Sequence, residues 1–168
     1  VNADDKHTQD ILRGAICKVE SYGIGDNADI KAENIELLHE PGKIGLTYDC
    51  TGLVNMKVEL NLPGKFSVYN SLCAIAITRH FDVDEEALKE TLKHVRVKGR
   101  IELVKVSDVF TLMIDYAHNA MALESILTTL KEYHPHRLVC LFGCGGNRSK
   151  ERRYEMGEVS GKLADLTI

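Results

Sequence analysis

The sequence lacks the features that mark several large classes of protein. Its 168 residues carry a formal net charge of −4, whereas nucleic-acid-binding domains usually show a basic excess. No apolar run approaches the roughly 18 residues of a membrane-spanning helix. We therefore expect no nucleic-acid partner and no membrane span. The whole sequence is 44% hydrophobic and 27% charged, which is ordinary for a globular protein.

The five cysteines also lack the spacing of a disulfide framework or a metal site. Their number is odd, no C-x-x-C pair occurs, and none lies in a cluster with histidine. Disulfide frameworks usually use an even number of cysteines, and zinc ligands usually come in closely spaced pairs. The pattern predicts free thiols, which persist in a reducing compartment, and thus favours a cytoplasmic location.

The first part of the sequence predicts a small antiparallel sheet with helices. Residues 30–38, 43–50 and 53–62 show β-type alternation, and Val54, Met56, Val58 and Leu60 would share one face. Residues 69–81 have no clear polar face, which is typical of a buried helix. Residues 82–95 predict a second helix, which Asp82 or Asp84 would cap.

After residue 98 the pattern changes to strands that alternate with helices. Strands are predicted at 101–106, 110–116, 137–143 and 165–168, and helices at 119–133 and 149–164. This alternation is typical of a parallel sheet with crossover helices. The fold class is therefore α/β, with a small sheet plus helices in residues 1–98 and half of a Rossmann-like domain in residues 99–168. Because the chain starts with Val1 and stops as a new apolar run opens, we expect it to be part of a longer protein.

One candidate site follows the predicted strand 110–116. Asp115 ends the apolar run FTLMI, and His118 comes three residues later. Ligands bind at the carboxyl ends of strands in open α/β sheets, and a carboxylate there can accept hydrogen bonds from ribose hydroxyls. The alternative is that Asp115 caps the following helix and His118 is a turn residue.

A second candidate is the glycine loop GCGGNRSK, residues 143–150. Lys150 is not preceded by glycine or followed by Ser or Thr, so the phosphate-loop pattern fails, and Arg148 replaces the third glycine of the dinucleotide pattern. The loop presents Asn147 and Arg148 at the end of a strand. Because the arginine fork matches a carboxylate with two parallel hydrogen bonds, a carboxylate ligand is at least as plausible as phosphate. A plain turn with a solvated arginine is the alternative.

Two weaker candidates lie in PGKFSVYN and GRIE. Asn70 could present a donor and an acceptor to an adenine edge, although helix capping by Ser67 is the commoner use of such a segment. Arg100 lies at the predicted domain hinge, where a Gly-Arg pair is usually only a hinge.

Four segments, in this order, resemble the MurE-type Mur ligases, and the resemblance covers essentially the whole chain. These ATP-dependent enzymes add the third amino acid to the UDP-N-acetylmuramoyl dipeptide of peptidoglycan precursors. The combination of GCGG-N/D-R with DYAH is specific to this branch, whereas DYAH alone also admits folylpolyglutamate synthases and cyanophycin synthetases. The segments are PGKFSVYN, GRIE, IDYAHNAMALESIL and FGCGGNRSKERRYEMG.

The resemblance implies a domain assignment and a set of binding residues. Residues 1–98 would be the C-terminal part of the central ATP-binding domain, and residues 99–168 the N-terminal part of the Rossmann-like domain that receives the amino acid. The implied roles are adenine contact for Asn70, phosphate contact for Arg100, ribose binding for Asp115 with His118 close by, and binding of the incoming amino acid's carboxylate for Arg148 with Asn147.

The implied reaction uses ATP and Mg²⁺ and passes through an acyl phosphate. The dipeptide carboxylate is phosphorylated, and the amine of a diamino acid, diaminopimelate or lysine, then attacks it. The 168 residues contain no Walker loop, and the family's magnesium ligands match no position in them, so we expect no catalytic residue here and no ligation by the isolated chain.

The sequence departs from the family pattern at two places and leaves two alternatives open. Ser67 stands where the family has asparagine, and residues 119–121 read NAM where TPD is common. The alternatives are a related folylpolyglutamate- or cyanophycin-type ligase and a non-catalytic Rossmann-like module. A phosphate loop upstream in the parent reading frame would favour a ligase.

Overall fold

A computed structural model describes residues 1–40, 43–147 and 149–168. The chain divides into two compact units, residues 1–95 and residues 96–168, which are described separately. The sequence-based boundary between residues 98 and 99 remains a prediction.

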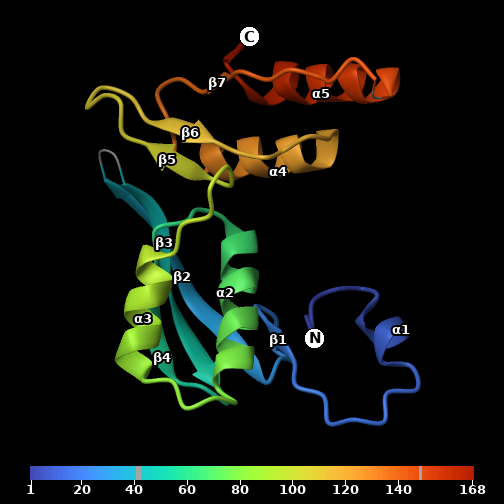
Figure 1. Ribbon diagram of the computed structural model, residues 1–168, viewed down its shortest axis with the longest axis vertical. Helices are drawn as coiled ribbons and strands as arrows, with labels where there is room; N and C mark the ends of the chain where they lie inside the picture. The colour runs from blue at the N-terminus through green and yellow to red at the C-terminus, as the bar shows by residue number, and fades with distance from the viewer. Residues whose placement is uncertain (41–42, 148) are drawn as a thin grey trace. The chain divides into compact units, whose positions relative to one another are not determined.

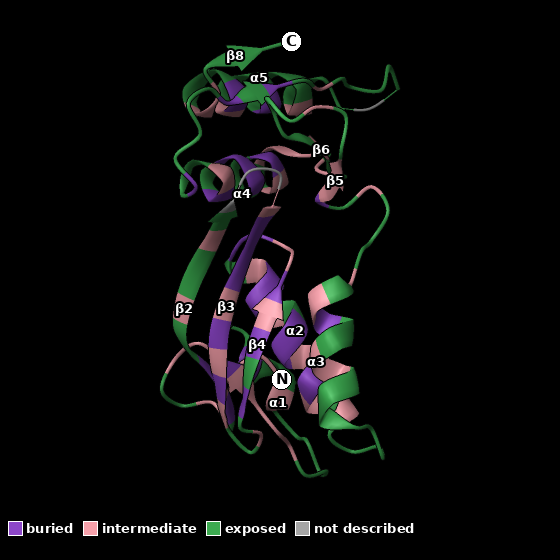
Figure 2. Ribbon diagram, turned by 90° about the vertical axis from the view of Figure 1, so that its left-hand side faces the viewer, coloured by how far each residue is buried: buried purple, intermediate pink, exposed green. Residues whose placement is uncertain are grey.

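Unit 1 is built on a four-stranded sheet (Figure 1). Strands β2, β3 and β4 pair antiparallel, as the three alternating runs predict, and the two-residue β1 pairs parallel with β2. Helices α2 and α3 cover one face of this sheet (Figures 1 and 2). The elements are α1 Thr8–Leu12, β1 Tyr22–Gly23, β2 Ile30–Glu40, β3 Lys43–Gly52, β4 Met56–Leu60, α2 Lys65–Thr78 and α3 Glu85–His94.

The core of unit 1 lies between the sheet and α2. Alternate residues of β4, namely Met56, Val58 and Leu60, are buried in it, and Val54 packs against its edge. Figure 2 shows the buried residues concentrated along β3, β4 and the facing side of α2. The predicted shared face of these four residues is thus confirmed, because period-2 alternation places them on the side that the helices cover.

Helix α2 is buried as predicted, but it spans residues 65–78 rather than 69–81. Ser67 does not cap it: Gly64 is the N-cap residue, and the Ser67 hydroxyl donates to the carbonyl of Pro63 at 2.7 Å. Helix α3 is capped by Asp84, whose carboxylate accepts a hydrogen bond from the backbone N–H of Ala87 at 2.9 Å.

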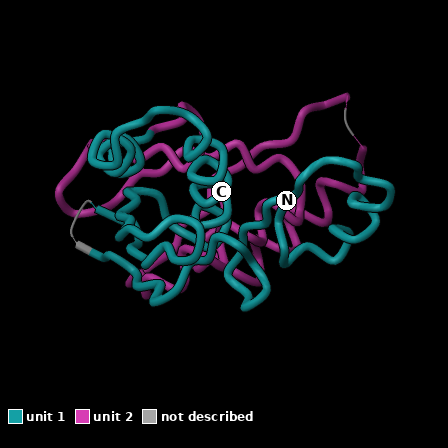
Figure 3. The backbone as a smooth tube through the Cα atoms, turned by 90° about the horizontal axis from the view of Figure 1, so that it is seen from below, with its two compact units in different colours: residues 1–95 teal, residues 96–168 magenta. Residues whose placement is uncertain are grey.

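Unit 2, residues 96–168 (Figure 3), combines a hairpin with a crossover unit. Strands β7 and β8 pair parallel and are joined through α5, as predicted. Strands β5 and β6 pair antiparallel, so the predicted parallel arrangement is wrong for them. Residues 105–111 are too few for a crossover, which needs about a dozen residues or more. The elements are β5 Glu102–Val104, β6 Leu112–Ile114, α4 Ala120–Lys131, β7 Val139–Cys140, α5 Lys150–Leu163 and β8 Leu166–Thr167.

Helices α4 and α5 pack against each other in unit 2 and carry much of its buried surface. Leu123, Ile126 and Leu127 of α4 are buried, as is Met156 of α5. Together the two units confirm the α/β class. No helix in the described part of the chain is long and apolar enough to cross a membrane.

Candidate functional site

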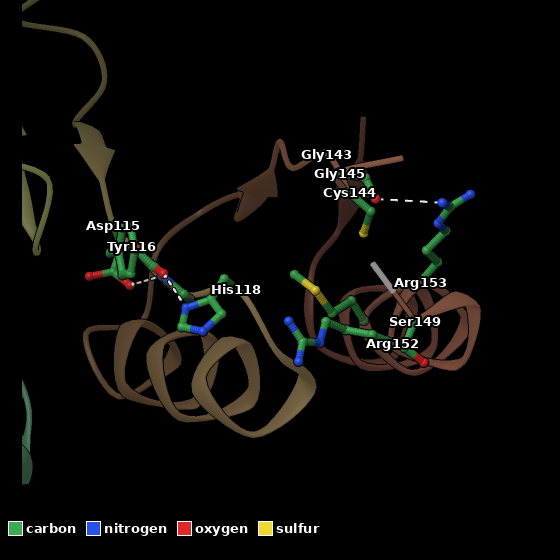
Figure 4. Close-up of a pocket in the computed structure, with 11 residues that line it drawn as sticks. Asp115, Tyr116, His118, Gly143, Cys144, Gly145, Ser149, Arg152 and Arg153 are labelled. Carbon is green, nitrogen blue, oxygen red and sulfur yellow. Dashed lines mark hydrogen bonds between the residues drawn. The ribbon is translucent and has the colours of Figure 1, made fainter. Parts of the chain in front are cut away.

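A hollow of about 410 Å³ lies in unit 2, beyond the ends of two strands (Figure 4). One wall is formed by Asp115 to His118, which directly follow β6, and another by Gly143 to Gly145, which follow β7. Arg152, Arg153 and Met156 of α5 also line it. Two of the candidate segments, DYAH and the glycine loop, therefore line one hollow at strand carboxyl ends, where α/β proteins bind ligands.

The Asp115 carboxylate joins two segments of unit 2. One oxygen accepts a hydrogen bond from the backbone N–H of Ile101 at 3.0 Å, and the other accepts from Ala117 at 2.8 Å. The cap of α4 is Asn119, whose side-chain oxygen accepts from Ala122 at 2.8 Å. The alternative in which Asp115 caps α4 is therefore wrong. A carboxylate offers about four lone-pair sites, so Asp115 keeps capacity for further donors.

Arg100 and His118 both contact the ring of Tyr116. The guanidinium carbon of Arg100 is 4.9 Å from the centre of the Tyr116 ring, a cation–π distance, and the rings of Tyr116 and His118 are 5.1 Å apart. The His118 Nδ1 donates to the Tyr116 carbonyl at 3.1 Å, which is a turn contact. Tyr116 was not among the predicted site residues, although its place between Asp115 and His118 in DYAH was the available signal.

The backbone at Arg100 is held in an uncommon conformation. Ile101 has φ of 50°, in the left-handed region that a β-branched residue rarely adopts. Its side chain is buried and its N–H is bonded to Asp115, so the surroundings fix this conformation. Strained backbone of this kind tends to occur at functional sites.

The glycine loop is held by α5. The Arg153 guanidinium donates to the carbonyl oxygens of Gly146 at 2.8 Å and Gly145 at 3.5 Å. Asn147 is exposed beside these glycines, and Arg148 lies outside the described residues. Arg152 is half-buried and points into the hollow (Figure 4). Neither helix arginine was among the predicted site residues, and the basic segment SKERR after the glycines was the available signal.

Asn70 belongs to the other unit, on an exposed side of α2. The structure thus brings Arg100, Asp115 and His118 together within unit 2, with the glycine loop at the same hollow. Within residues 1–40, 43–147 and 149–168, no three His, Cys, Asp or Glu side chains are grouped so as to hold a metal ion.

Two family models match most of the chain. The model described as "Mur ligase middle domain" matches residues 1–78, and the model described as "Mur ligase, glutamate ligase domain" matches residues 99–168. A UDP-N-acetylmuramoyl-L-alanyl-D-glutamate–2,6-diaminopimelate ligase of Caldanaerobacter subterraneus subsp. tengcongensis is 38% identical over all of this chain and 34% of its own length. The chain thus spans about a third of the length of the curated relatives it matches.

Solved structures agree with these matches. A structure of a UDP-N-acetylmuramoyl-L-alanyl-D-glutamate–2,6-diaminopimelate ligase superposes with a TM-score of 0.67 at 27% identity, covering 98% of this chain and 35% of that one. A UDP-N-acetylmuramoylalanyl-D-glutamyl-2,6-diaminopimelate–D-alanyl-D-alanyl ligase from Acinetobacter baumannii superposes with a TM-score of 0.78 at 21% identity, over 99% of this chain and 37% of that one. At that identity the second likeness shows the fold alone.

Proposed function

The chain belongs to the Mur ligase family, and from this premise we propose that it forms part of an ATP-dependent ligase that adds diaminopimelate to UDP-N-acetylmuramoyl-L-alanyl-D-glutamate. The observation that carries the proposal is the likeness of the whole chain to a diaminopimelate ligase at 38% identity. The shared hollow of the DYAH segment and the glycine loop supports it. The alternative is that the enzyme adds lysine instead of diaminopimelate.

On the nucleotide side, Arg100, Asp115 and His118 would act together. Asp115 accepts hydrogen bonds from two backbone N–H groups and keeps lone pairs for ribose hydroxyls. Arg100, oriented by the Tyr116 ring, would contact phosphate, where a guanidinium gives charge-assisted hydrogen bonds. Asn70 would contact the adenine edge from its exposed position on α2.

On the acceptor side, the glycine loop would hold the incoming amino acid. Arg148 would bind a carboxylate through its planar fork, with Asn147 beside it. Arg153 binds the carbonyls of Gly145 and Gly146 from α5, which fixes this part of the loop. By binding the carboxylate, the glycine loop would also orient the amine of the incoming amino acid.

The proposed reaction joins these two sides. The dipeptide carboxylate takes the γ-phosphoryl group of ATP, which forms an acyl phosphate and releases ADP. The amine of diaminopimelate then attacks the acyl carbon, so that an amide forms and phosphate leaves. Cationic groups such as Arg100 would stabilise the charge that develops on the phosphoryl oxygens. The described residues offer no acidic cluster for Mg²⁺, so the proposal assigns the magnesium ligands to another part of the parent protein.

A ligation assay on the parent protein tests the proposal. We expect the UDP-linked tripeptide, identified by mass, only when ATP, Mg²⁺, the UDP-linked dipeptide and diaminopimelate are all present. Formation of folylpolyglutamate from folate and glutamate instead would favour the folylpolyglutamate-type alternative. Absence of any ligation would favour a non-catalytic module. Since ATP and UDP-linked precursors are cytoplasmic nucleotides, the proposal also places the protein in the cytoplasm.

The Arg148→Ala variant of the parent protein tests the acceptor side. We expect the KM for diaminopimelate to rise about tenfold or more, because a charge-assisted hydrogen-bond pair is lost. The KM for ATP should stay within about twofold, since the nucleotide side is untouched. Arg137→Ala, at an exposed arginine before β7, is the matched control and should change neither value. Equal increases in both KM values for Arg148→Ala would contradict a carboxylate role.

A further inference from the structure

Two successive arginines on α5 serve different purposes. Residues next to each other on an α-helix point about 100° apart around its axis. Arg153 points to the glycine loop and donates to its carbonyls, whereas Arg152 points into the hollow, towards the side of His118 (Figure 4). Arg153 is therefore occupied by the protein itself, and Arg152 faces the space that a ligand would fill.

Arg152 has no counterion among the residues that the structure describes. The side chain is half-buried, yet within the described part of the chain it has no hydrogen bond or ion pair. Asp115 lines the same hollow, but within the described residues no ion pair joins its carboxylate to Arg152. The guanidinium therefore keeps its five N–H donors available for an anion that enters the hollow.

We propose that Arg152 binds a carboxylate of the incoming amino acid in this hollow, as a second cation in addition to the one proposed for Arg148. The proposal rests on the proposed function, because it identifies the anion as part of the acceptor. The lining of the hollow favours a carboxylate over a phosphoryl group, because Arg152 shares it with Gly143 to Gly145 of the glycine loop, the proposed acceptor side. A dicarboxylic diamino acid offers two carboxylates, and the planar guanidinium fork matches each of them.

Equilibrium binding to the parent protein, measured by calorimetry without turnover, tests this role. Arg152→Gln should weaken diaminopimelate binding about tenfold or more and leave ATP binding within about twofold. Arg152→Lys should recover part of the loss, since lysine restores the charge but not the fork. Lys162→Gln is the control, because it removes one exposed positive charge from the same helix, where Lys162 pairs with Glu158.

A second readout keeps the test independent of any change in folding. In the unmodified parent protein, the NMR signal of the Arg152 Nε–H group should shift on titration with diaminopimelate and stay unchanged with inorganic phosphate. A shift with phosphate alone, or weaker ATP binding in Arg152→Gln, would move Arg152 to the nucleotide side and overturn the proposal. Unchanged diaminopimelate affinity in Arg152→Gln would overturn it as well.

The two proposals can fail separately. If the unmodified protein binds diaminopimelate through Arg152 but forms no tripeptide, the ligase function fails and the carboxylate site stands. If the protein ligates and Arg152→Gln binds diaminopimelate normally, the carboxylate site fails and the ligase function stands.

Discussion

Asp115 connects the segment around Ile101 to the loop before α4 through one carboxylate. Both oxygens accept backbone hydrogen bonds, and one of these holds Ile101 in its left-handed conformation. The same side chain is the proposed ribose ligand. A substitution here should therefore disturb the backbone beside Arg100 even when no nucleotide is present.

Asp115→Ala should increase amide hydrogen exchange at Ile101 and Ala117, measured by NMR on this chain. The Ile101 N–H is part-buried in this hydrogen bond, and a typical hydrogen bond contributes about 0.5–1.5 kcal/mol, so the protection of Ile101 should fall by a comparable free energy. Asp108→Ala is the control, because Asp108 is exposed and pairs only with Lys105 at 3.7 Å. Unchanged exchange at Ile101 in Asp115→Ala would contradict the role of this carboxylate.

Glu20 is a carboxylate whose pKa is strongly lowered by its neighbours. Hydrogen bonds from Arg79, with a further one from His80, hold its pKa at about 2, below the ordinary value of 4.5. Because the pKa is lowered in the folded state, the ionised form stabilises the fold above pH 4.5. This contribution is lost as the pH falls from 4.5 to about 2.

An NMR titration of the Glu20 carboxylate should give a midpoint of about 2 in the unchanged chain. In Arg79→Ala the midpoint should move up towards 4.5, because the first cause of the shift is removed. Arg96→Ala, at another exposed arginine, should leave the midpoint where it was. A midpoint already near 4.5 in the unchanged chain would show that the pairing with Arg79 does not persist in solution.

Helix α2 is the element that closes the core of unit 1. Leu72 is fully buried against the sheet, whereas Ile77 on the same helix is 58% exposed. Leu72→Ala should lower the free energy of unfolding of unit 1 by about 2–5 kcal/mol, because a cavity replaces buried methyl groups. Ile77→Ala should change it by less than about 1 kcal/mol. Urea unfolding followed by NMR signals of β3 measures both, and equal losses would contradict the assigned core.

The sequence predicted those elements whose signals are local. Period-2 alternation identified β2, β3 and β4, and a run of apolar residues on all sides identified α2 as buried. The Asp84 cap of α3 was one of two candidates, and the structure selects it. The β5–β6 hairpin was missed because alternating strands and helices favour a parallel arrangement, and only the short connection at residues 105–111 argues against it.

Side-chain direction at the site could be predicted only in part. Asp115 and the glycine loop were expected at strand ends, and both line the hollow. The contact of Arg100 with Tyr116 and the separate directions of Arg152 and Arg153 depend on how the loop and α5 pack, which no local pattern specifies. The role of Arg148 stays a prediction.

The two units together match about a third of a diaminopimelate ligase's length. The 168 residues contain residues proposed for nucleotide and acceptor binding, but no phosphate loop. Since phosphoryl transfer needs a cradle for the β- and γ-phosphates, the isolated chain should not form the tripeptide. Ligation by the 168-residue chain alone would contradict the expectation that the reaction needs a phosphate loop from another part of the parent protein.

The most direct measurement follows an oxygen atom through the reaction of the parent protein. The UDP-linked dipeptide is labelled with ¹⁸O in the carboxylate that receives the amine, and the released phosphate is analysed by mass spectrometry. Because an acyl phosphate passes one carboxylate oxygen to phosphate, we predict one ¹⁸O atom in the phosphate for each amide formed. Amide formation with unlabelled phosphate, or phosphate release that does not depend on diaminopimelate, would contradict the proposed ligase.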